Sequence, residues 1–274
     1  MKDQFRTHLY PKSRIGTYDI GKLSSSKHHV CGLIEVDVTS ARNTINQLKT
    51  NNYPISFTSW LIKCIGDFAN QYPLIHGVKK GKRKIITYSS VDISIIIEKE
   101  IDSTLVPIPY IIRGANNKSI SDIYNEIKNA KEQLINDEGD FVLGDSPGKF
   151  MMNFYYLLPG FVRKFIWKRI IANPSLVKNL IGSVILTSVG MVGTINGWII
   201  PKSIHPLCFA ISSTTSKPGV IDSQIAIREY LPITILVDHD VIDGAPAVKI
   251  LKKLVDALET GYLLEKKPPF GSEK

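Results

Sequence analysis

Cysteine is scarce in this chain of 274 residues, which contains only Cys31, Cys64 and Cys208. These three residues are scattered, so they form neither a disulfide framework nor the closely spaced pairs of a metal or redox site. We therefore expect a reducing compartment, the cytoplasm, and no bound metal.

Signals for secretion and for membrane insertion are also missing. The first 21 residues are polar and mixed in charge, so we expect no secretory signal. Residues 179–201 carry no formal charge over a length that would cross a bilayer. They also contain four glycines and several hydroxyl side chains, which favours buried strands and turns. The chain shows no internal repeat.

Acidic side chains are outnumbered, with 25 Asp and Glu against 34 Lys and Arg and a net charge of +9. Such an excess is typical of nucleic-acid binding when it is concentrated in a known module. Here the basic residues are spread along the chain, and a smaller anion accounts for the charge equally well. We therefore expect no nucleic acid as partner. The densest basic run, residues 79–84, predicts a solvated hairpin tip, with a contact to phosphate or to an acidic carrier domain as the alternative.

The apolar residues predict one α/β domain. Hydrophobic residues make up 43% of the chain and charged residues 22%, which is ordinary for a globular protein with one sizeable core. Helices and strands interleave without strict alternation, so we predict a mixed β-sheet covered by helices rather than a doubly wound sheet. The predicted strands are residues 29–37, 84–88, 91–97, 105–111, 183–188, 207–213, 224–228 and 232–237, and the predicted helices are residues 39–49, 58–71, 121–134 and 246–259.

One segment, residues 149–171, is aromatic and basic together and reads KFMMNFYYLLPGFVRKFIWKRII. Such a pattern is found in basic amphipathic helices that lie on membranes or on acidic partners. The other interpretations are a helical pair packed on the sheet or at a subunit interface, and a lid or wall of a substrate pocket.

The most informative segment is residues 235–247, ILVDHDVIDGAPA, in which an apolar strand runs into His239 and a helix follows. Catalytic groups collect in such strand-to-helix turns. An imidazole titrates near neutral pH and can take a proton from a thiol or hydroxyl. A hydrogen-bonded loop histidine is the other interpretation. Asp243 either caps the helix or braces the loop, or takes a direct catalytic part.

This segment resembles the signature DHRxxDG of the coenzyme-A-dependent acyltransferases. The match is closest to the catalytic domain of the 2-oxoacid dehydrogenase acyltransferases, the dihydrolipoamide acyltransferases. Asp238, His239, Asp243 and Gly244 fit the signature, whereas Asp240 stands where the family has arginine. This difference leaves the residues of the proposed chemistry in place, but any contact that the family's arginine makes is not expected here.

A second segment, residues 182–193, reads GSVILTSVGMVG and resembles the family's GTFTISNLGMFG. In the family the serine of this block stabilises the tetrahedral intermediate. Thr187 aligns with it and Ser188 is its neighbour, so the resemblance implies a hydroxyl at this place and leaves open which residue presents it.

The resemblance extends from about residue 14 to residue 259 through several blocks in the same order. It implies the two-layer sandwich of the chloramphenicol acetyltransferase type, with a mixed sheet covered by helices. We expect a single catalytic domain over residues 1–274 with no lipoyl domain. Its parts would be a core over about 14–262, a variable helical segment over 137–173 and a flexible tail over 263–274.

The resemblance also implies the chemistry. His239 would be the general base in direct transfer of an acyl group between the thioester of coenzyme A and a thiol such as dihydrolipoamide, or another acceptor. The lipoyl group would come from a separate chain. The family places its active site between subunits of a homotrimer, which can be the unit of a larger cage. The alternatives are a non-catalytic trimeric scaffold, and a membrane-associated acyltransferase that uses residues 149–171 to reach a lipid-like acceptor.

Overall fold

A computed structural model describes residues 6–10, 13–101, 104–133, 154–188 and 196–264. The first part of the predicted variable segment, residues 189–193 of the second signature block and most of the predicted tail lie outside these residues.

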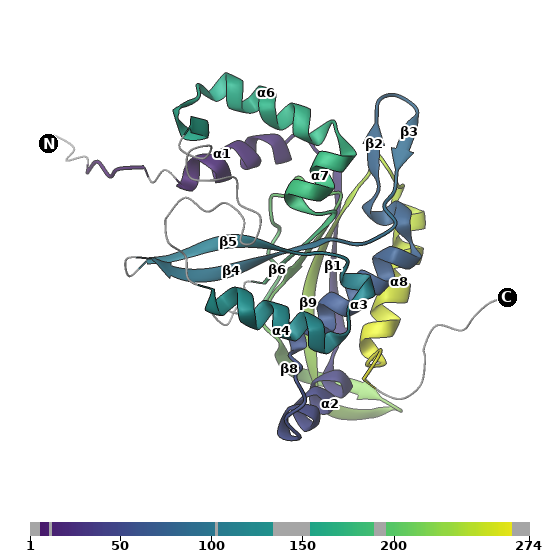
Figure 1. The fold of residues 1–274 in the computed structure, drawn as a ribbon. Coiled ribbons are helices and arrows are strands. Elements are labelled where there is room, and N and C mark those ends of the chain that lie inside the picture. Colours follow the sequence, from purple (N-terminus) through teal and green to yellow (C-terminus); the bar gives the residue numbers. More distant parts are fainter. Residues whose placement is uncertain (1–5, 11–12, 102–103, 134–153, 189–195, 265–274) are drawn as a thin grey trace, which may run out of the picture.

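A mixed β-sheet is the centre of the fold, as predicted (Figure 1). Strands β4, β6 and β7 run parallel to one another, and the other pairings are antiparallel. Within the described residues seven strands form this sheet: in spatial order β1 (His29–Asp37), β9 (Gln224–Asp238), β7 (Leu207–Ile211), β6 (Val184–Ser188), β4 (Ile93–Ile101) and β5 (Thr104–Ile112), with β8 (Thr215–Ile221) also paired to β9.

Four helices cover one face of this sheet, namely α2 (Thr39–Thr50), α3 (Phe57–Gln71), α4 (Ile120–Glu132) and α8 (Gly244–Glu259). Their beginnings follow from local chemistry. The side chains of Ser56 and Ser119 each accept a hydrogen bond from a backbone N–H in the first turn of α3 and of α4. Each serine thereby satisfies a donor that the helix itself leaves unpaired. The prediction placed these four helices within two residues of their observed ends.

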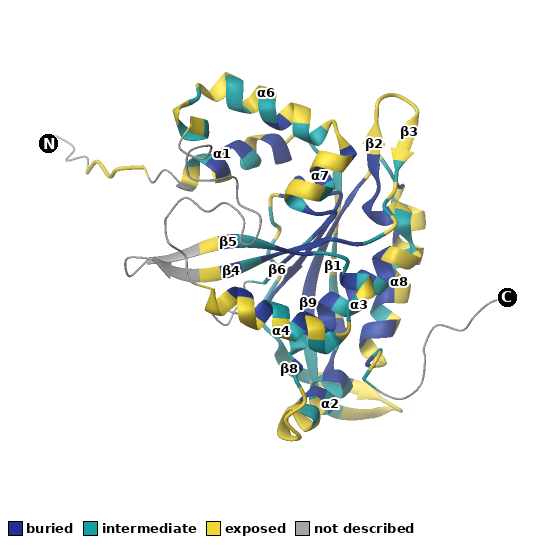
Figure 2. Ribbon diagram, viewed as in Figure 1, coloured by how far each residue is buried: buried dark blue, intermediate teal, exposed yellow. Residues whose placement is uncertain are grey.

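The main hydrophobic core lies between the sheet and these four helices (Figure 2). Alternate residues of β9, from Leu231 to Val237, face it, and Trp60, Phe68 and Phe209 are its largest fully buried side chains. Full burial of one such side chain contributes roughly 1.5–3 kcal/mol. This core therefore holds β9, which carries the predicted catalytic turn, rigidly against the helices.

A separate group of three helices stands apart from this layer: α1 (Ser13–Ser24), α6 (Gly160–Ile171) and α7 (Pro174–Ile181) (Figure 1). Helix α6 contacts both α1 and α7. The group has a small core of its own made by Leu23, Trp167 and Ile204. Within the predicted variable helical segment, residues 160–171 form α6, which packs on other helices.

The structure corrects several predicted boundaries. The two strands predicted at 224–228 and 232–237 are one strand, β9, which runs through Pro232. This proline donates no hydrogen bond, but its carbonyl accepts one from the Ser212 N–H at 3.1 Å. The short strand β3 (Lys84–Ile86) ends before the predicted residue 88.

Four elements were missed by the prediction, namely α1, α7, β8 and the short strand β2 (Val78–Lys80). Strand β8 contains Pro218 and Gly219, which are poor strand formers. Strands β2 and β3 form the predicted hairpin, and its basic tip is exposed. The remaining short elements are the 3-10 turns η1 (Pro73–His76) and η2 (Ala115–Asn117).

The uncharged stretch 179–201 contains the end of α7 and strand β6 in its described part. Among the described residues no helix combines the length and the apolarity that crossing a bilayer requires.

Two buried histidines make the fold sensitive to acid. Burial lowers the pKa of His76 and of His205 to about 4, from an ordinary value of 6.5. Both rings are therefore neutral when folded, and the unfolded chain takes up protons first as the pH falls. Stability is complete above about pH 6.5. Towards pH 4 it falls by up to about 1.4 kcal/mol per pH unit for each ring.

We expect His76→Leu to remove the share of this acid sensitivity that belongs to His76. The measurement is the free energy of urea unfolding at several pH values from 7 to 4. The slope against pH should decrease by up to about 1.4 kcal/mol per unit. His8→Leu, at an exposed residue, is the control and should leave the slope unchanged. Equal slopes in His76→Leu and the unaltered protein would contradict the prediction.

Candidate active site

His239 lies directly after β9, in the predicted turn between this strand and helix α8. The strand ends at the buried Asp238, and the backbone N–H of Val241 donates to the carbonyl of Asp238 at 3.0 Å to close the turn. The N–H of His239 donates to the carbonyl of His28 at 2.9 Å, which ties the turn to the beginning of β1. The backbone of this turn is thus fixed on two sides.

The His239 side chain is 47% exposed, so its ring is open to a substrate or to another chain. Its Nε2 lies 3.9 Å from Oδ1 of Asp243, which is too far for a hydrogen bond. Asp243 occupies the predicted cap position of α8, yet its side chain is 82% exposed and makes no capping hydrogen bond. The cap was therefore predicted at the right residue, but with a contact that the structure does not show.

A buried ion pair holds the end of β9, directly before the turn. The Asp238 carboxylate is only 4% exposed, and Lys27 Nζ lies 2.8 Å from its Oδ2. The other carboxylate oxygen, Oδ1, accepts the backbone N–H of Asp240 at 3.1 Å. Asp238, at the end of β9, is therefore bound both to Lys27, two residues before β1, and to the turn. The sequence analysis named Asp238 in the signature but missed Lys27, which lies 211 positions away in the chain.

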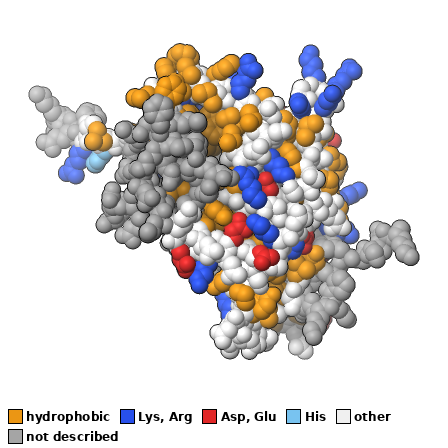
Figure 3. Space-filling model, viewed as in Figure 1, with side chains coloured by type: hydrophobic (Ala, Val, Ile, Leu, Met, Phe, Trp, Pro, Cys, Tyr) orange, Lys and Arg blue, Asp and Glu red, His pale blue; other side chains and the backbone are white. Residues whose placement is uncertain are grey.

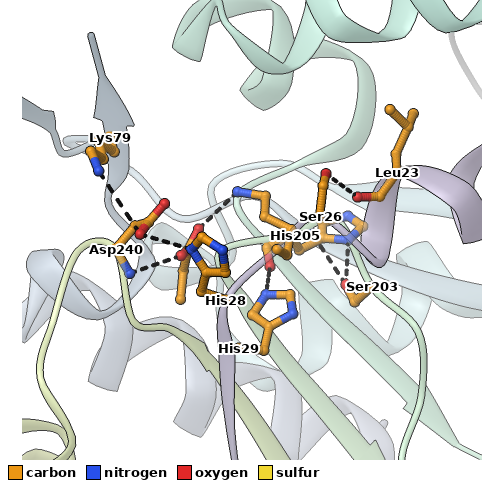
Figure 4. A network of polar contacts seen from close by, with 10 residues as sticks. Leu23, Ser26, His28, His29, Lys79, Ser203, His205 and Asp240 are labelled. Atoms are coloured by element: carbon orange, nitrogen blue, oxygen red, sulfur yellow. Dashed lines mark hydrogen bonds and ion pairs between the residues drawn. The ribbon is translucent and has the colours of Figure 1, made fainter. Parts of the chain in front are cut away.

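Asp240, which replaces the arginine of the signature, has basic partners (Figure 4). Its Oδ1 lies 3.1 Å from His28 Nδ1 and 3.8 Å from Lys79 Nζ. The hydrogen bond from His28, with the nearby lysines, lowers the pKa of Asp240. The site therefore accommodates a charge opposite to that of the signature. Lys79 belongs to the β2–β3 hairpin, so this part of the basic run contacts the turn.

Behind the turn lies a second layer of polar contacts, seen in Figure 4. His29 Nε2 is 2.9 Å from the carbonyl oxygen of His205. The His205 ring lies between Ser203 Oγ at 3.1 Å and the carbonyl oxygen of Ile181 at 2.8 Å. Burial lowers the pKa of both histidines, so the layer is neutral and places no second charge beside Asp238.

The hydroxyls of Thr187 and Ser188 lie at the end of β6. Side chains alternate along a strand, so these two point to opposite faces of the sheet. Val184 and Leu186 face the main core, which places Ser188 on the helix-covered face and Thr187 on the other. Both residues are partly buried.

Within one chain the structure keeps these hydroxyls far from His239. Thr187 pairs with Ala210, and Ala210 pairs with Thr234 of β9, which is five residues before His239. At about 3.3 Å per residue and about 4.8 Å per strand, the two sites are roughly 15–20 Å apart. The four predicted site residues thus form two separate groups, His239 with Asp243 and Thr187 with Ser188.

A family model described as "2-oxoacid dehydrogenases acyltransferase (catalytic domain)" matches residues 20–138 and 177–264. The chain is also 23% identical to the lipoamide acyltransferase component of the branched-chain alpha-keto acid dehydrogenase complex of Bacillus subtilis, over 85% of this chain. It is 21% identical to the dihydrolipoyllysine-residue succinyltransferase component of the 2-oxoglutarate dehydrogenase complex of Bos taurus, over 84% of this chain. It spans 47% and 43% of the lengths of these two proteins, so about half of each.

Solved structures share the fold. A probable dihydrolipoamide acetyltransferase of Listeria monocytogenes superposes with a TM-score of 0.67 and 19% identity, over 97% of this chain and 99% of that one. The dihydrolipoamide acetyltransferase of Azotobacter vinelandii gives a TM-score of 0.66 and 17% identity, over 94% and 93%. The latter structure accompanies a study of a serine, a histidine and an asparagine in its catalytic mechanism.

The buried ion pair gives a first test of the turn. Lys27→Met leaves the Asp238 carboxylate buried without its cation, and such a loss typically costs about 3–5 kcal/mol. We expect a decrease of this size in the free energy of urea unfolding at pH 7. Lys252→Met is the control: it breaks an exposed ion pair on α8 and should change the free energy of unfolding by less than about 1 kcal/mol.

A double variant separates the pair from other effects of the Lys27 side chain. Lys27→Met combined with Asp238→Asn removes both charges, so it should lose clearly less stability than the sum of the two single variants. A strictly additive loss would show that the two side chains do not interact.

Proposed function

The chain belongs to the family of 2-oxoacid dehydrogenase acyltransferase catalytic domains, and we propose that it transfers an acyl group between coenzyme A and a thiol. The acceptor or donor thiol would be dihydrolipoamide-like, carried by a lipoyl group on a separate chain. Acyl-coenzyme A is a substrate in this proposal. The family relationship favours this function over a non-catalytic scaffold, and the basic partners of Asp240 remove one reason to suspect a degenerate site.

The observation that carries the proposal is an exposed imidazole on a backbone that is fixed on two sides. His239 is held by the hydrogen bond to the carbonyl of His28, and Asp238 is held by Lys27. A positioned histidine of this kind contributes typically about 10²–10⁴ to the rate of a proton transfer. Half of its side chain is nevertheless free to meet a substrate.

The proposed reaction is one of direct transfer. His239 removes the proton from the attacking thiol, and the thiolate adds to the carbonyl carbon of the thioester. The resulting oxyanion accepts a hydrogen bond from a hydroxyl group. When the intermediate collapses, the bond to the original sulfur breaks, and the proton on His239 passes to the leaving thiolate. Asp243, which follows His239 by four positions, is proposed to act on the ring or on its loop.

Thr187 is the hydroxyl that we propose for the oxyanion. It precedes His239 by 52 positions, and the serine studied in the Azotobacter vinelandii protein precedes the histidine of that protein by the same number. The asparagine studied there follows its histidine by four positions, as Asp243 follows His239 here. Ser188 points to the other face of the sheet and is the alternative.

Both groups must lie within about 3 Å of the reacting atoms, so one chain cannot supply them together. We therefore propose that His239 of one copy faces Thr187 of the next in a homotrimer, alone or as the unit of a larger cage. A solved relative forms the cubic core of a pyruvate dehydrogenase multienzyme complex. We also propose that residues 1–274 are one catalytic domain that works in the cytoplasm.

Removal of the imidazole tests the general base. We expect His239→Gln to lower the rate of acyl transfer from acyl-coenzyme A to dihydrolipoamide by about 10²–10⁴. The measurement is the mass of S-acyldihydrolipoamide formed with time, because one thiol replaces another and total thiol does not change. His8→Gln is the control and should keep full activity. Full activity in His239→Gln would overturn the mechanism.

The two hydroxyls are compared in the same assay. Thr187→Ala should lower kcat by about 10²–10³, the usual cost of one oxyanion donor. Ser188→Ala should lower it much less. The reverse order would assign the oxyanion to Ser188.

Mixed assemblies test the shared site. We expect His239→Gln and Thr187→Ala chains, co-expressed with different affinity tags and purified through both, to recover activity that neither has alone. Every mixed trimer has one interface in three with an intact His239 facing an intact Thr187, so activity should reach about one third of the unaltered level. Recovery of no activity above that of the separate variants would place the whole site within one chain.

A further inference from the structure

Helix α6 is apolar on two opposite sides. Its inner side is buried, with Trp167 in the small core of the three-helix group. On its outer side Phe161 is 76% and Phe165 57% exposed. An apolar side of a helix normally packs against a partner. The outer side of α6 is thus apolar without a covering element among the described residues.

Hydrogen bonds fix which side of α6 faces outward. The buried Asp19 of α1 accepts from Arg163 Nε and from the Tyr155 hydroxyl, both at 2.7 Å. The Tyr155 hydroxyl in turn accepts from Trp167 Nε1 at 2.8 Å. Rotation of α6 to hide its two phenylalanines would break these contacts. The exposure of Phe161 and Phe165 is therefore built into the packing of the helix.

Positive charge surrounds these two rings. Lys164, Lys168 and Arg169 are exposed beside them, and the Arg169 guanidinium lies 5.1 Å from the centre of the Phe165 ring. We call Phe161, Lys164, Phe165, Lys168 and Arg169 the outer face of α6. Figure 3 shows hydrophobic side chains gathered at the edge of the molecule where α6 lies.

The three-helix group has almost no negative charge. Helices α6 and α7 contain neither Asp nor Glu, and the acidic residue of α1, Asp19, is bound to Arg163. The three helices together contain seven basic residues and one acidic residue. An anionic surface would therefore meet no unpaired acidic side chain on these three helices.

The outer face of α6 also lies outside the part of the chain that matches the family. The family model stops at residue 138 and resumes at residue 177, so it omits the whole of α6. The match to the family model therefore does not account for this face.

We propose that the outer face of α6 docks this protein onto an anionic membrane surface. The two aromatic rings would enter the boundary between headgroups and acyl chains, and the lysines and the arginine would contact lipid phosphates. A second copy is a poor partner, because a two-fold contact would place the same basic side chains against each other. The inference does not depend on the proposed acyl transfer.

The test is co-sedimentation of the whole protein with vesicles. At low salt we expect binding to vesicles of phosphatidylcholine with one quarter phosphatidylserine, and at least about tenfold weaker binding to pure phosphatidylcholine. High salt should weaken binding to the anionic vesicles, because it screens the charges. Equal binding to both kinds of vesicle, or no binding to either, overturns the proposal.

Two double variants locate the contact. Lys164→Gln with Lys168→Gln should weaken the partition coefficient by about thirtyfold, since each lysine near an anionic surface contributes about fivefold. Phe161→Ser with Phe165→Ser should weaken it by at least about tenfold. Circular dichroism and thermal unfolding check that each variant is folded.

Matched controls come from elsewhere on the surface. Lys249→Gln with Lys253→Gln removes two exposed lysines at the same spacing on α8, and Ile225→Ser with Ile227→Ser removes two apolar side chains that are each 81% exposed. Neither control should change binding to anionic vesicles. A loss in the controls as large as in the α6 variants overturns the proposal.

Two further outcomes also overturn the proposal. If the lysine variant loses binding but the phenylalanine variant does not, the face binds anions without entering a membrane. If the phenylalanine variant instead lowers the mass of the protein in light scattering and vesicles do not bind, the face is an interface between copies of this chain.

Discussion

The buried Asp238 carboxylate is the contact on which the candidate site depends. It lies at the end of the buried half of β9, where an ionised group needs a partner and hydrogen bonds. Lys27 supplies the charge and the Asp240 N–H supplies a donor. Because Lys27 precedes β1 and Asp240 belongs to the turn, satisfying one carboxylate fixes both segments. His239, which lies between Asp238 and Asp240, therefore has a fixed backbone while its ring stays exposed.

The register of the sheet imposes the second constraint. Strand β6 runs parallel to β7, and β7 is antiparallel to β9, so the end of β6 lies far from the end of β9. The two signature blocks therefore end roughly 15–20 Å apart on the same sheet. A rigid sheet cannot bend to join them. If both blocks serve one reaction, a second chain must bring its own block to the first, and assembly becomes part of catalysis.

Much of this arrangement could be predicted from the sequence, and the reasons for the failures are physical. Periodicity and caps predicted the strand at 29–37 and the helices on the covered face, because each pattern is local. The turn at His239 was predicted by its strand and helix. The Lys27–Asp238 pair was missed because the two residues meet only through the pairing of β1 with β9. Strand β8 was missed because long-range pairing with β9 overrides the poor propensity of Pro218 and Gly219.

Helix α6 shows how the same local reasoning fails when both sides of a helix are apolar. The sequence predicted a helix with aromatic and basic residues, but composition alone left open which ring would be buried. The network through Asp19 decides this, since it requires Trp167 and Tyr155 on the inside. Phe161 and Phe165 are then exposed because the hydrogen bonds of the inner side fix the orientation of α6. The buried Asp19 carboxylate, which accepts from Arg163 and Tyr155, therefore fixes the direction in which α6 presents its basic side chains.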